Sequence, residues 1–339
     1  MTPFNPDAAA APGSGIYGLP HTPDEARVVL LPVPFEATTS YGKGTASGPR
    51  AILEASRQVD LFDLETGRPY EGGISMLDEP IEVRAWNDEA TALAKPVIEA
   101  GGEGADRQTL ARIDALCERM NHWVYETTQR WLGAGKRVGL VGGDHSTPFG
   151  CIRAHAERYP GMGVLHLDAH ADLREAYEGF TWSHASIMFN VAQRIPQVAK
   201  LVQVAVRDVG EAEHHFIEHS QGRVVTFFDQ KLQAAAFDGT PWSRQVDEII
   251  SCLPQDVYLS FDIDGLDPVL CPHTGTPVPG GLSFGQACAL VAGVVRSGRR
   301  IVGLDLNEVA PGPEGGEWDG NVAARLLYKM IGWMLRSWP

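Results

Sequence analysis

The sequence predicts an α/β fold in which a parallel sheet is covered by helices on both faces. Three observations lead to this prediction: short apolar runs recur along the chain, helix-length segments separate most of them, and each run is apolar throughout instead of alternating. Strands that are buried on both faces have this continuous pattern. The 339 residues are many for one domain but acceptable for a single large α/β unit.

The expected strands are the apolar runs themselves. They lie at residues 27–33, 137–141, 163–167, 201–206, 223–228, 256–261 and 300–306. We expect a helix over 48–56, and a long helix through 110–124, where apolar side chains recur at helical spacing until Gly133. Ser283 and Gln286 have the spacing of a capping box at the start of a further helix.

Two segments are expected to lie outside the core. Residues 1–26 are rich in Ala, Pro, Gly and Thr, and we interpret them as an N-terminal tail or a subunit-contact arm. Residues 79–106 are acidic, contain glycine and lack clear periodicity in their second half, which predicts a long surface excursion. No internal repeat or linker divides the rest, so residues 27–339 are expected to form one domain.

Composition argues against two classes of partner. The net charge of −15 disfavours nucleic acid, because phosphate contacts need clustered Lys and Arg, and it fits a cationic ligand better. No stretch approaches the ~20 apolar residues that span a bilayer, so no membrane partner is expected. The five cysteines include no C-x-x-C pair and the first residues show no signal-peptide pattern, which predicts a reduced, cytoplasmic protein.

Acidic residues and histidines follow three of the expected strands. The motifs are GGDHS after 137–141, DAHAD after 163–167 and DID after 256–261. Sites form beyond the carboxyl ends of strands in an open parallel sheet, and extended residues two apart point to the same side. The side chains expected to meet are those of His145, Asp168, His170, Asp172, Asp262 and Asp264.

Two imidazoles and four carboxylates form a donor set for divalent metal ions. Such ligands suit Mn²⁺, and also Zn²⁺, Ni²⁺, Co²⁺ or Fe²⁺. Four carboxylates balance the charge of two divalent ions, whereas four bare carboxylates together would be very costly. A lone D-x-D or D-x-H is common in loops, but three clusters that each follow an apolar strand are far more specific. Two bound metal ions are therefore expected.

The motifs GGDHS, DAHAD and SFDIDGLDP, in this order, resemble the signature motifs of the ureohydrolases, which include arginase, agmatinase, guanidinobutyrase and formiminoglutamase. YGKGTASGPRAI, CPHTGTPVPGGL and GLDLNEVAP resemble further family elements, so the resemblance covers most of the chain. It implies an arginase-like three-layer α/β/α sandwich with a mostly parallel sheet of about eight strands. It also implies that residues 27–339 form a single ureohydrolase domain that hydrolyses a guanidino group to urea and an amine.

The resemblance assigns each metal ligand a position. Asp168 and Asp262 would bridge two ions, most often Mn²⁺ in the family. The remaining ligands would be His145 with Asp172 on one ion, and His170 with Asp264 on the other. Two such ions lower the pKa of a shared water towards neutral. Asp172 would also pass a proton to the leaving nitrogen, because an alkylamide ion is a very poor leaving group.

Two further residues gain roles from the resemblance. Glu308 matches the glutamate that holds the substrate guanidinium, and a carboxylate can accept paired N–H bonds from a planar cation. His184 resembles the histidine that contacts the substrate and shuttles protons to bulk water. Asn307 lies where many relatives carry Val, so the local packing is expected to differ. Asp144 is expected to orient His145 or to cap a turn.

The substrate is expected to depend on the loop after DAHAD. Arg174 stands where arginases usually carry an Asn that grips the α-amino and α-carboxylate groups. Glu175 and Glu178 favour a cationic substrate, whereas Arg174 could bind a carboxylate or pair with Glu178. The predicted order is agmatine, which yields putrescine and urea, then guanidinobutyrate, another guanidino acid or guanidine, and then arginine.

Two readings from other classes compete with this one. A single-metal, deacetylase-like amidohydrolase would need fewer ligands, and a non-catalytic partner subunit should have lost ligands or the glutamate. All of these residues are present, which favours a catalytic protein. Relatives are commonly trimers or hexamers, so the resemblance also implies a homo-oligomer.

Overall fold

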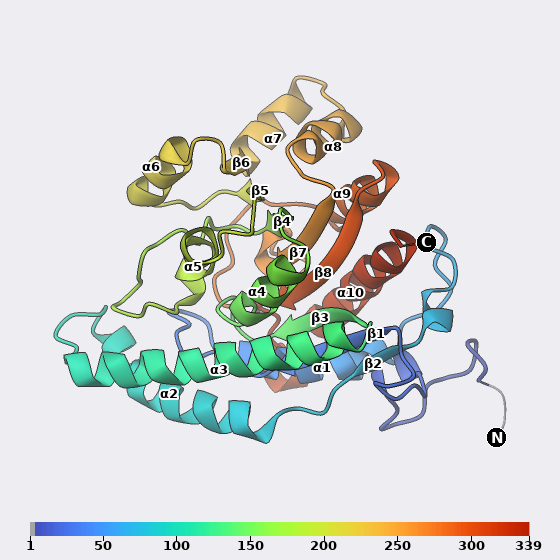
Figure 1. Ribbon diagram of the computed structural model, residues 1–339, viewed down its shortest axis with the longest axis horizontal. Helices are drawn as coiled ribbons and strands as arrows, with labels where there is room; N and C mark the ends of the chain where they lie inside the picture. Colours follow the sequence, from blue (N-terminus) through green and yellow to red (C-terminus); the bar gives the residue numbers. More distant parts are fainter. Residues whose placement is uncertain (1–3, 339) are drawn as a thin grey trace.

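The computed structural model describes residues 4–338 and contains one eight-stranded sheet in the order β2-β1-β3-β8-β7-β4-β5-β6 (Figure 1). Every neighbouring pair is parallel. The strands are β1 (Val28–Val33), β2 (Ile74–Met76), β3 (Arg137–Gly142), β4 (Gly163–Leu167), β5 (Lys200–Val206), β6 (Val224–Phe228), β7 (Asp256–Asp262) and β8 (Arg300–Asn307). All seven strands expected from apolar runs are present, and the three-residue edge strand β2 is the one that the pattern missed.

Helices cover both faces of this sheet (Figure 1). The described residues form α1 (Gly48–Ser56), α2 (Ile81–Glu99), α3 (Arg107–Gly133), α4 (Phe149–Arg158), α5 (Ile187–Arg194), α6 (Glu211–His219), α7 (Asp229–Phe237), α8 (Trp242–Ser251), α9 (Phe284–Arg296) and α10 (Trp318–Arg336). One apolar core lies under α1, α8, α9 and α10, and a second lies under α2 to α5. The predicted three-layer α/β/α sandwich is thus confirmed. Within the described residues, no helix combines the length and the apolar character needed to cross a membrane.

The prediction of a surface excursion over residues 79–106 is wrong. Helix α2 occupies most of this segment and α3 begins directly after Asp106, whose carboxylate caps it by accepting from the backbone N–H of Thr109 at 2.9 Å. Val83 and three further small apolar residues of α2 are buried, while its acidic side chains face solvent. The buried face holds only two valines, two alanines and an asparagine, and Pro96 interrupts the last turn, so the apolar pattern is weak.

Part of the N-terminal segment belongs to the core, contrary to the expectation for residues 1–26. Ile16, Tyr17 and Leu19 are buried in the cluster under α1 and α10. The Tyr17 hydroxyl donates to the backbone carbonyl of Ala324 at 3.0 Å, and its ring lies 4.7 Å from that of Tyr328. These contacts span most of the chain length, so local composition does not reveal them. A role of this segment in subunit contact stays a prediction.

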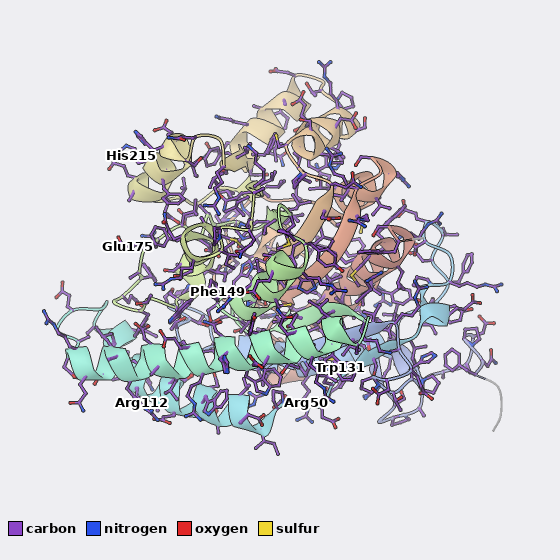
Figure 2. All side chains as sticks on the ribbon, in the orientation of Figure 1. Arg50, Arg112, Trp131, Phe149, Glu175 and His215 are labelled. Carbon is purple, nitrogen blue, oxygen red and sulfur yellow. The ribbon has the colours of Figure 1, made fainter. Side chains whose placement is uncertain are left out.

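Four neighbouring strands in the middle of the sheet position the site. The residues at the carboxyl ends of β3, β8, β7 and β4 include the three His/Asp motifs and Glu308. His215 on α6 lies at the surface, away from that edge (Figure 2). His214, His215 and His219 are all exposed, so this histidine cluster on α6 is a solvated face.

A buried histidine on α4 makes the protein sensitive to acid. The ring of His155 packs against Gly303 of β8, and its Nδ1 donates to the carbonyl of Cys151 at 2.8 Å. Burial lowers the pKa of His155 from 6.5 to about 4. Between these two pKa values the unfolded chain therefore binds more protons at His155 than the folded protein does. The contribution of the neutral, buried His155 to the free energy of unfolding is complete above the unfolded-state pKa, and it is lost as the pH falls towards the folded-state pKa.

Urea denaturation at two pH values tests this effect. Between about pH 7.5 and about pH 5, His155 should contribute a loss of roughly 2 kcal/mol in the free energy of unfolding. The His155→Gln variant should lack this part of the loss, whereas the exposed control His122→Gln should keep the wild-type dependence. An unchanged dependence in His155→Gln would contradict the assignment.

Candidate metal centre and substrate cavity

The turn after β3 presents His145 to the carboxyl edge of the sheet. Gly143 lies so close to the loop after β1 that a Cβ there would be 2.0 Å from the carbonyl oxygen of Phe35. Asp144 is buried and accepts from the backbone N–H of Ser146 at 3.0 Å. Of the two roles expected for Asp144, the structure shows the capping of this turn.

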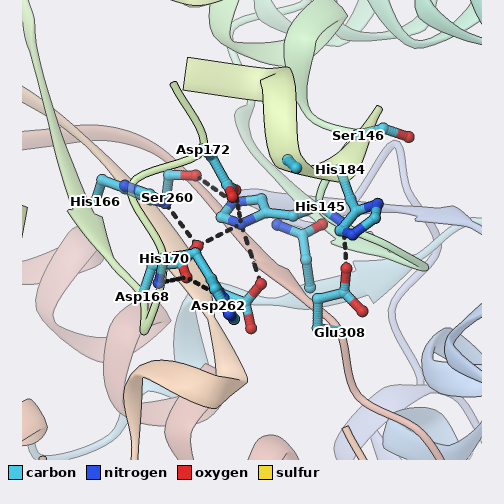
Figure 3. Close-up of polar contacts among 12 residues, drawn as sticks. His145, Ser146, His166, Asp168, His170, Asp172, His184, Ser260, Asp262 and Glu308 are labelled. Atoms are coloured by element: carbon cyan, nitrogen blue, oxygen red, sulfur yellow. Dashed lines mark hydrogen bonds and ion pairs between the residues drawn. The ribbon is translucent and has the colours of Figure 1, made fainter. Parts of the chain in front are cut away.

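The first group of donor atoms surrounds Nδ1 of His145 (Figure 3). This nitrogen lies 3.0 Å from Asp168 Oδ2, 3.2 Å from Asp262 Oδ2 and 3.5 Å from Asp172 Oδ2. The other ring nitrogen, Nε2, lies 3.0 Å from the hydroxyl of Ser260. Because that hydroxyl donates to Asp305 Oδ1 at 2.9 Å, it accepts from Nε2–H of His145. Nδ1 therefore directs a lone pair at three carboxylates unless a cation or a proton lies between them.

The second group surrounds Nδ1 of His170. It lies 3.1 Å from Asp264 Oδ2 and 3.4 Å from Asp168 Oδ1. The two oxygens of Asp168 thus face two different histidines, which is the arrangement that a bridging carboxylate requires. Asp262 directs one oxygen at His145, and its other oxygen accepts from the backbone N–H of Asp264 at 2.9 Å.

The electrostatics of these side chains show why a cation fits. Burial and the charge of Asp168 raise the pKa of Asp172 well above its usual value. Burial and the charges of Asp264 and Asp168 do the same to Asp262. Burial opposes protonation of His145, but its hydrogen bond to Asp168 and the surrounding charges raise its pKa to about 9. Nitrogen and carboxylate donors around a buried excess of negative charge fit divalent metal ions.

The structure adds one residue that sequence reasoning missed. Donor atoms of His145, His166, Asp168 and Asp172 lie within 4.8 Å of one another, as do those of Asp168, His170 and Asp264. His166 is the new member. It lies inside the apolar run of β4, which reads as core, but it precedes Asp168 by two residues and so points to the same side.

Glu308 follows β8 directly and is buried beside this cluster. Its Oε1 accepts from the backbone N–H of His145 at 2.9 Å, while its Oε2 has no hydrogen-bond partner among the described residues. Burial and the charges of Asp262 and Asp144 raise the pKa of Glu308 well above its usual range. Its φ of 64° is unusual for a residue with a side chain. A strained, buried carboxylate with one free oxygen suits a cationic hydrogen-bond donor.

The neighbouring Asn307 has polar partners where Val would have none. Its Nδ2 donates to Asp305 Oδ1 at 2.6 Å, and its Oδ1 accepts from the hydroxyl of Thr147 at 2.9 Å. The packing around Asn307 is therefore polar, and the side chain ties the end of β8 to the turn after β3.

A cavity of about 270 Å³ leads from the surface to the cluster. Its lining includes His170, Asp172, His184, Arg174, Tyr177 and Asp208. His184 is buried, and its Nε2 lies 3.4 Å from the hydroxyl of Ser40. Burial, with the charges of His170 and Lys43, lowers the pKa of His184 to about 3. His184 is thus neutral at physiological pH.

The loop after DAHAD does not bring its glutamates to this cavity. Glu175 is exposed and points outward (Figure 2), and Glu178 does not line the cavity either. The suggestion that these two residues favour a cationic substrate is therefore not supported. Arg174 does line the cavity, but it lies 4.9 Å from the Tyr177 ring and 3.7 Å from Glu213 Oε2 instead of pairing with Glu178.

The cluster of buried His and Asp side chains lies at the carboxyl edge of a parallel sheet, and one of its carboxylates faces both histidines. This arrangement is typical of metal-dependent α/β enzymes. The model of the arginase family matches residues 26–332, and the chain belongs to this family. Members of this family depend on a binuclear metal centre, and the donor groups above fit such a centre.

Known proteins are similar over nearly the whole chain. The chain is 35% identical to the N(1)-aminopropylagmatine ureohydrolase of Thermus thermophilus, with 94% of each protein covered. It is 31% identical to the agmatinase of Sodalis glossinidius, covering 89% of this chain and 85% of that protein. The crystal structure of the agmatine ureohydrolase of Thermoplasma volcanium has the same fold, with a TM-score of 0.72, 21% identity and coverage of 95% and 94%.

Proposed function

We propose that this protein hydrolyses the guanidino group of a small cationic substrate, with agmatine first, which would yield urea and putrescine. The observation that carries this proposal is Glu308, a buried carboxylate with one free oxygen next to His145. A planar guanidinium supplies the paired N–H donors that such a group lacks. Curated relatives named agmatinase and N(1)-aminopropylagmatine ureohydrolase support the same chemistry.

Two divalent ions complete the proposed site, with Mn²⁺ first and Ni²⁺, Co²⁺ or Zn²⁺ as alternatives. When bound, they supply a water of lowered pKa as the nucleophile. The proposed ligands are His145, Asp168, His170, Asp172, Asp262 and Asp264. Asp168, with each oxygen facing a different histidine, is the group best suited to join the two positions.

The protein's own groups would carry the proton to the leaving amine. Asp172 is buried, and burial with the charge of Asp168 makes it hold a proton more tightly than an exposed aspartate. It can therefore accept a proton more readily than an exposed aspartate and pass it to the leaving nitrogen. The neutral His184 beside Ser40 lines the cavity and would exchange protons with solvent.

Replacement of Asp172 with Asn should lower kcat by roughly 10²- to 10⁴-fold, because a positioned acid contributes about this much. Glu175→Gln in the same loop is the matched control, since that side chain is exposed and lies outside the cavity. Steady-state urea release, with the metal content of both variants measured, checks the result. A loss below about tenfold in Asp172→Asn would contradict its role as proton carrier.

The outer part of the cavity favours a second positive charge on the substrate. Arg174 stays with Tyr177 and Glu213, while Asp208 on the rim has no ion-pair partner within residues 4–338. A free amine at the far end of the substrate would meet Asp208, whereas a carboxylate would need Arg174 to leave its partners. Agmatine and its aminopropyl derivative therefore precede guanidinobutyrate, other guanidino acids and guanidine, and arginine comes last.

Gly275 sets the space available for the guanidinium. A Cβ at this position would lie 3.0 Å from Glu308 Oε2 and 3.3 Å from Thr39 Cγ2. Gly275→Ala should therefore raise the KM by about tenfold or more, since the methyl group occupies space beside the free oxygen. Gly285→Ala on α9 is the control, because nothing lies within 4 Å of its Cβ. Equal KM values for the two variants would place the guanidinium elsewhere.

The proposed function is tested by urea release from the metal-loaded protein. The panel is agmatine, 4-guanidinobutyrate, arginine and guanidine, each assayed after loading with Mn²⁺, Ni²⁺ or Co²⁺. Agmatine should give the highest kcat/KM, with putrescine formed in an amount equal to the urea. If none of the four compounds released urea, the proposal would be wrong.

A cytoplasmic location and a homo-oligomer of three or six chains complete the proposed function. All five cysteines are free, which suits a reducing compartment. The net charge of −15 suits a small cationic substrate, not a nucleic acid. Size measurement in solution tests the assembly, and a monomer would contradict it.

A further inference from the structure

Three polar side chains form a row across neighbouring strands behind the metal cluster. His166 on β4 is paired in register with Gln203 on β5, and Gln203 is paired with Thr226 on β6. His166 and Gln203 are completely buried. None of the three belongs to the ligand set proposed above. The row ends on Asp168, two residues after His166.

The carbonyl of Ala171 determines how the Gln203 amide is oriented. Gln203 Nε2 lies 2.6 Å from this carbonyl oxygen, and Gln203 Oε1 accepts from the Thr226 hydroxyl at 2.9 Å. A flipped amide would bring its oxygen against the carbonyl oxygen of Ala171. The NH₂ group is therefore the part that also lies 3.0 Å from His166 Nδ1. Since an NH₂ group only donates, His166 Nδ1 must accept.

The tautomer of His166 follows from this contact. With Nδ1 as acceptor, the ring proton lies on Nε2, which is 2.8 Å from Asp168 Oδ2 and donates to it. The other oxygen, Oδ1, accepts from the backbone N–H of His170 at 2.6 Å. Each oxygen of Asp168 is thus held by one donor, and each keeps a lone pair on the side of the histidine that it faces, where a cation would bind.

We propose that His166 is a positioning residue that orients the carboxylate of Asp168 for metal binding, and that Gln203 selects the His166 tautomer that does so. The proposal goes beyond the reaction and substrate given above. It also separates His166 from the ligands themselves, although its ring lies among their donor atoms. A ligating Nε2 would have to give up the proton that Gln203 places there. Hydrogen bonds to ligating carboxylates of this kind contribute to metal affinity.

The tautomer is measured on metal-free protein labelled with ¹⁵N-histidine. The signal of His166 is identified by its loss in His166→Gln. We expect correlations of a neutral ring protonated at Nε2 in the wild type, and a reduced share of this tautomer in Gln203→Leu. A wild-type ring protonated at Nδ1 would overturn the proposal. Urea release plays no part in this measurement, so its outcome is independent of the proposed function.

Measurements of metal affinity distinguish a hydrogen-bonding role of His166 from a packing role and from direct ligation of a metal ion. His166→Gln keeps an N–H donor towards Asp168, and His166→Leu has a similar size but no donor. In calorimetric titrations with Mn²⁺, His166→Leu should bind roughly 10- to 100-fold more weakly than wild type, while His166→Gln should stay within about threefold. Equal losses in both variants would indicate a ligand, and no loss in His166→Leu would indicate packing alone; either result overturns the proposal. Circular dichroism of both variants verifies the fold.

Discussion

Replacing Asp168 with Asn should reduce kcat/KM for urea release by on the order of 10³-fold and should leave fewer than two metal ions bound. Asp168 Oδ2 faces His145 and Asp168 Oδ1 faces His170, so one carboxylate serves both positions. Asparagine offers one oxygen and one NH₂ group, and the NH₂ group would point at a histidine or a metal ion. The variant therefore loses both charge and a ligand atom.

Metal analysis and urea release on the same sample check this result. Asp247→Asn is the matched control, since Asp247 is an exposed residue of α8 and the charge change is the same. The control should retain wild-type metal content and activity. Two tightly bound ions in Asp168→Asn, with activity within tenfold of wild type, would contradict the bridging role.

Replacing Glu308 with Gln should lower kcat/KM by roughly 10²- to 10³-fold while leaving the metal content unchanged. Truncation of one partner in a buried, hydrogen-bonded charge pair typically costs about 2–5 kcal/mol, which corresponds to such a factor. Glu308 lies outside both groups of metal donors, so the ions should stay bound. Glu314→Gln is the control, because Glu314 is exposed and also has a positive φ, of 56°.

The backbone of Glu308 allows a second variant. Its φ of 64° is strained for a residue with a side chain but relaxed for glycine. Glu308→Gly should therefore unfold at no lower urea concentration than wild type and still lose activity. A stable Glu308→Gly variant that hydrolyses agmatine at the wild-type rate would exclude Glu308 as the substrate anchor.

Continuous apolar runs were sufficient to find the long strands. β4 was expected over the same residues as observed, and the helix at 48–56 matches α1. The capping box at α9 is present, with the backbone N–H of Gln286 donating to the Ser283 hydroxyl at 3.2 Å. These features are local, so neighbouring residues alone specify them. The strand order and the three-residue strand β2 depend on contacts between distant segments.

The same distinction between local sequence signals and contacts of distant residues applies to the candidate site. The six proposed ligands could be predicted from the sequence because each motif follows a strand and has a short spacing. Three other features were missed or misjudged for lack of a local signal. His166 reads as part of an apolar strand, and the partner of Arg174 is Glu213, a distant residue on α6. The buried face of α2 holds only two valines, two alanines and an asparagine, so a helix was interpreted as an excursion.

Two metal positions joined by Asp168 are central to the proposed chemistry. Calorimetric titration of metal-free protein with Mn²⁺, paired with elemental analysis of the loaded protein, counts them directly. Two ions per chain are predicted, in agreement with the binuclear centre of the family. One ion per chain, or none, would contradict the proposed centre and would favour a single-metal amidohydrolase or a non-catalytic subunit.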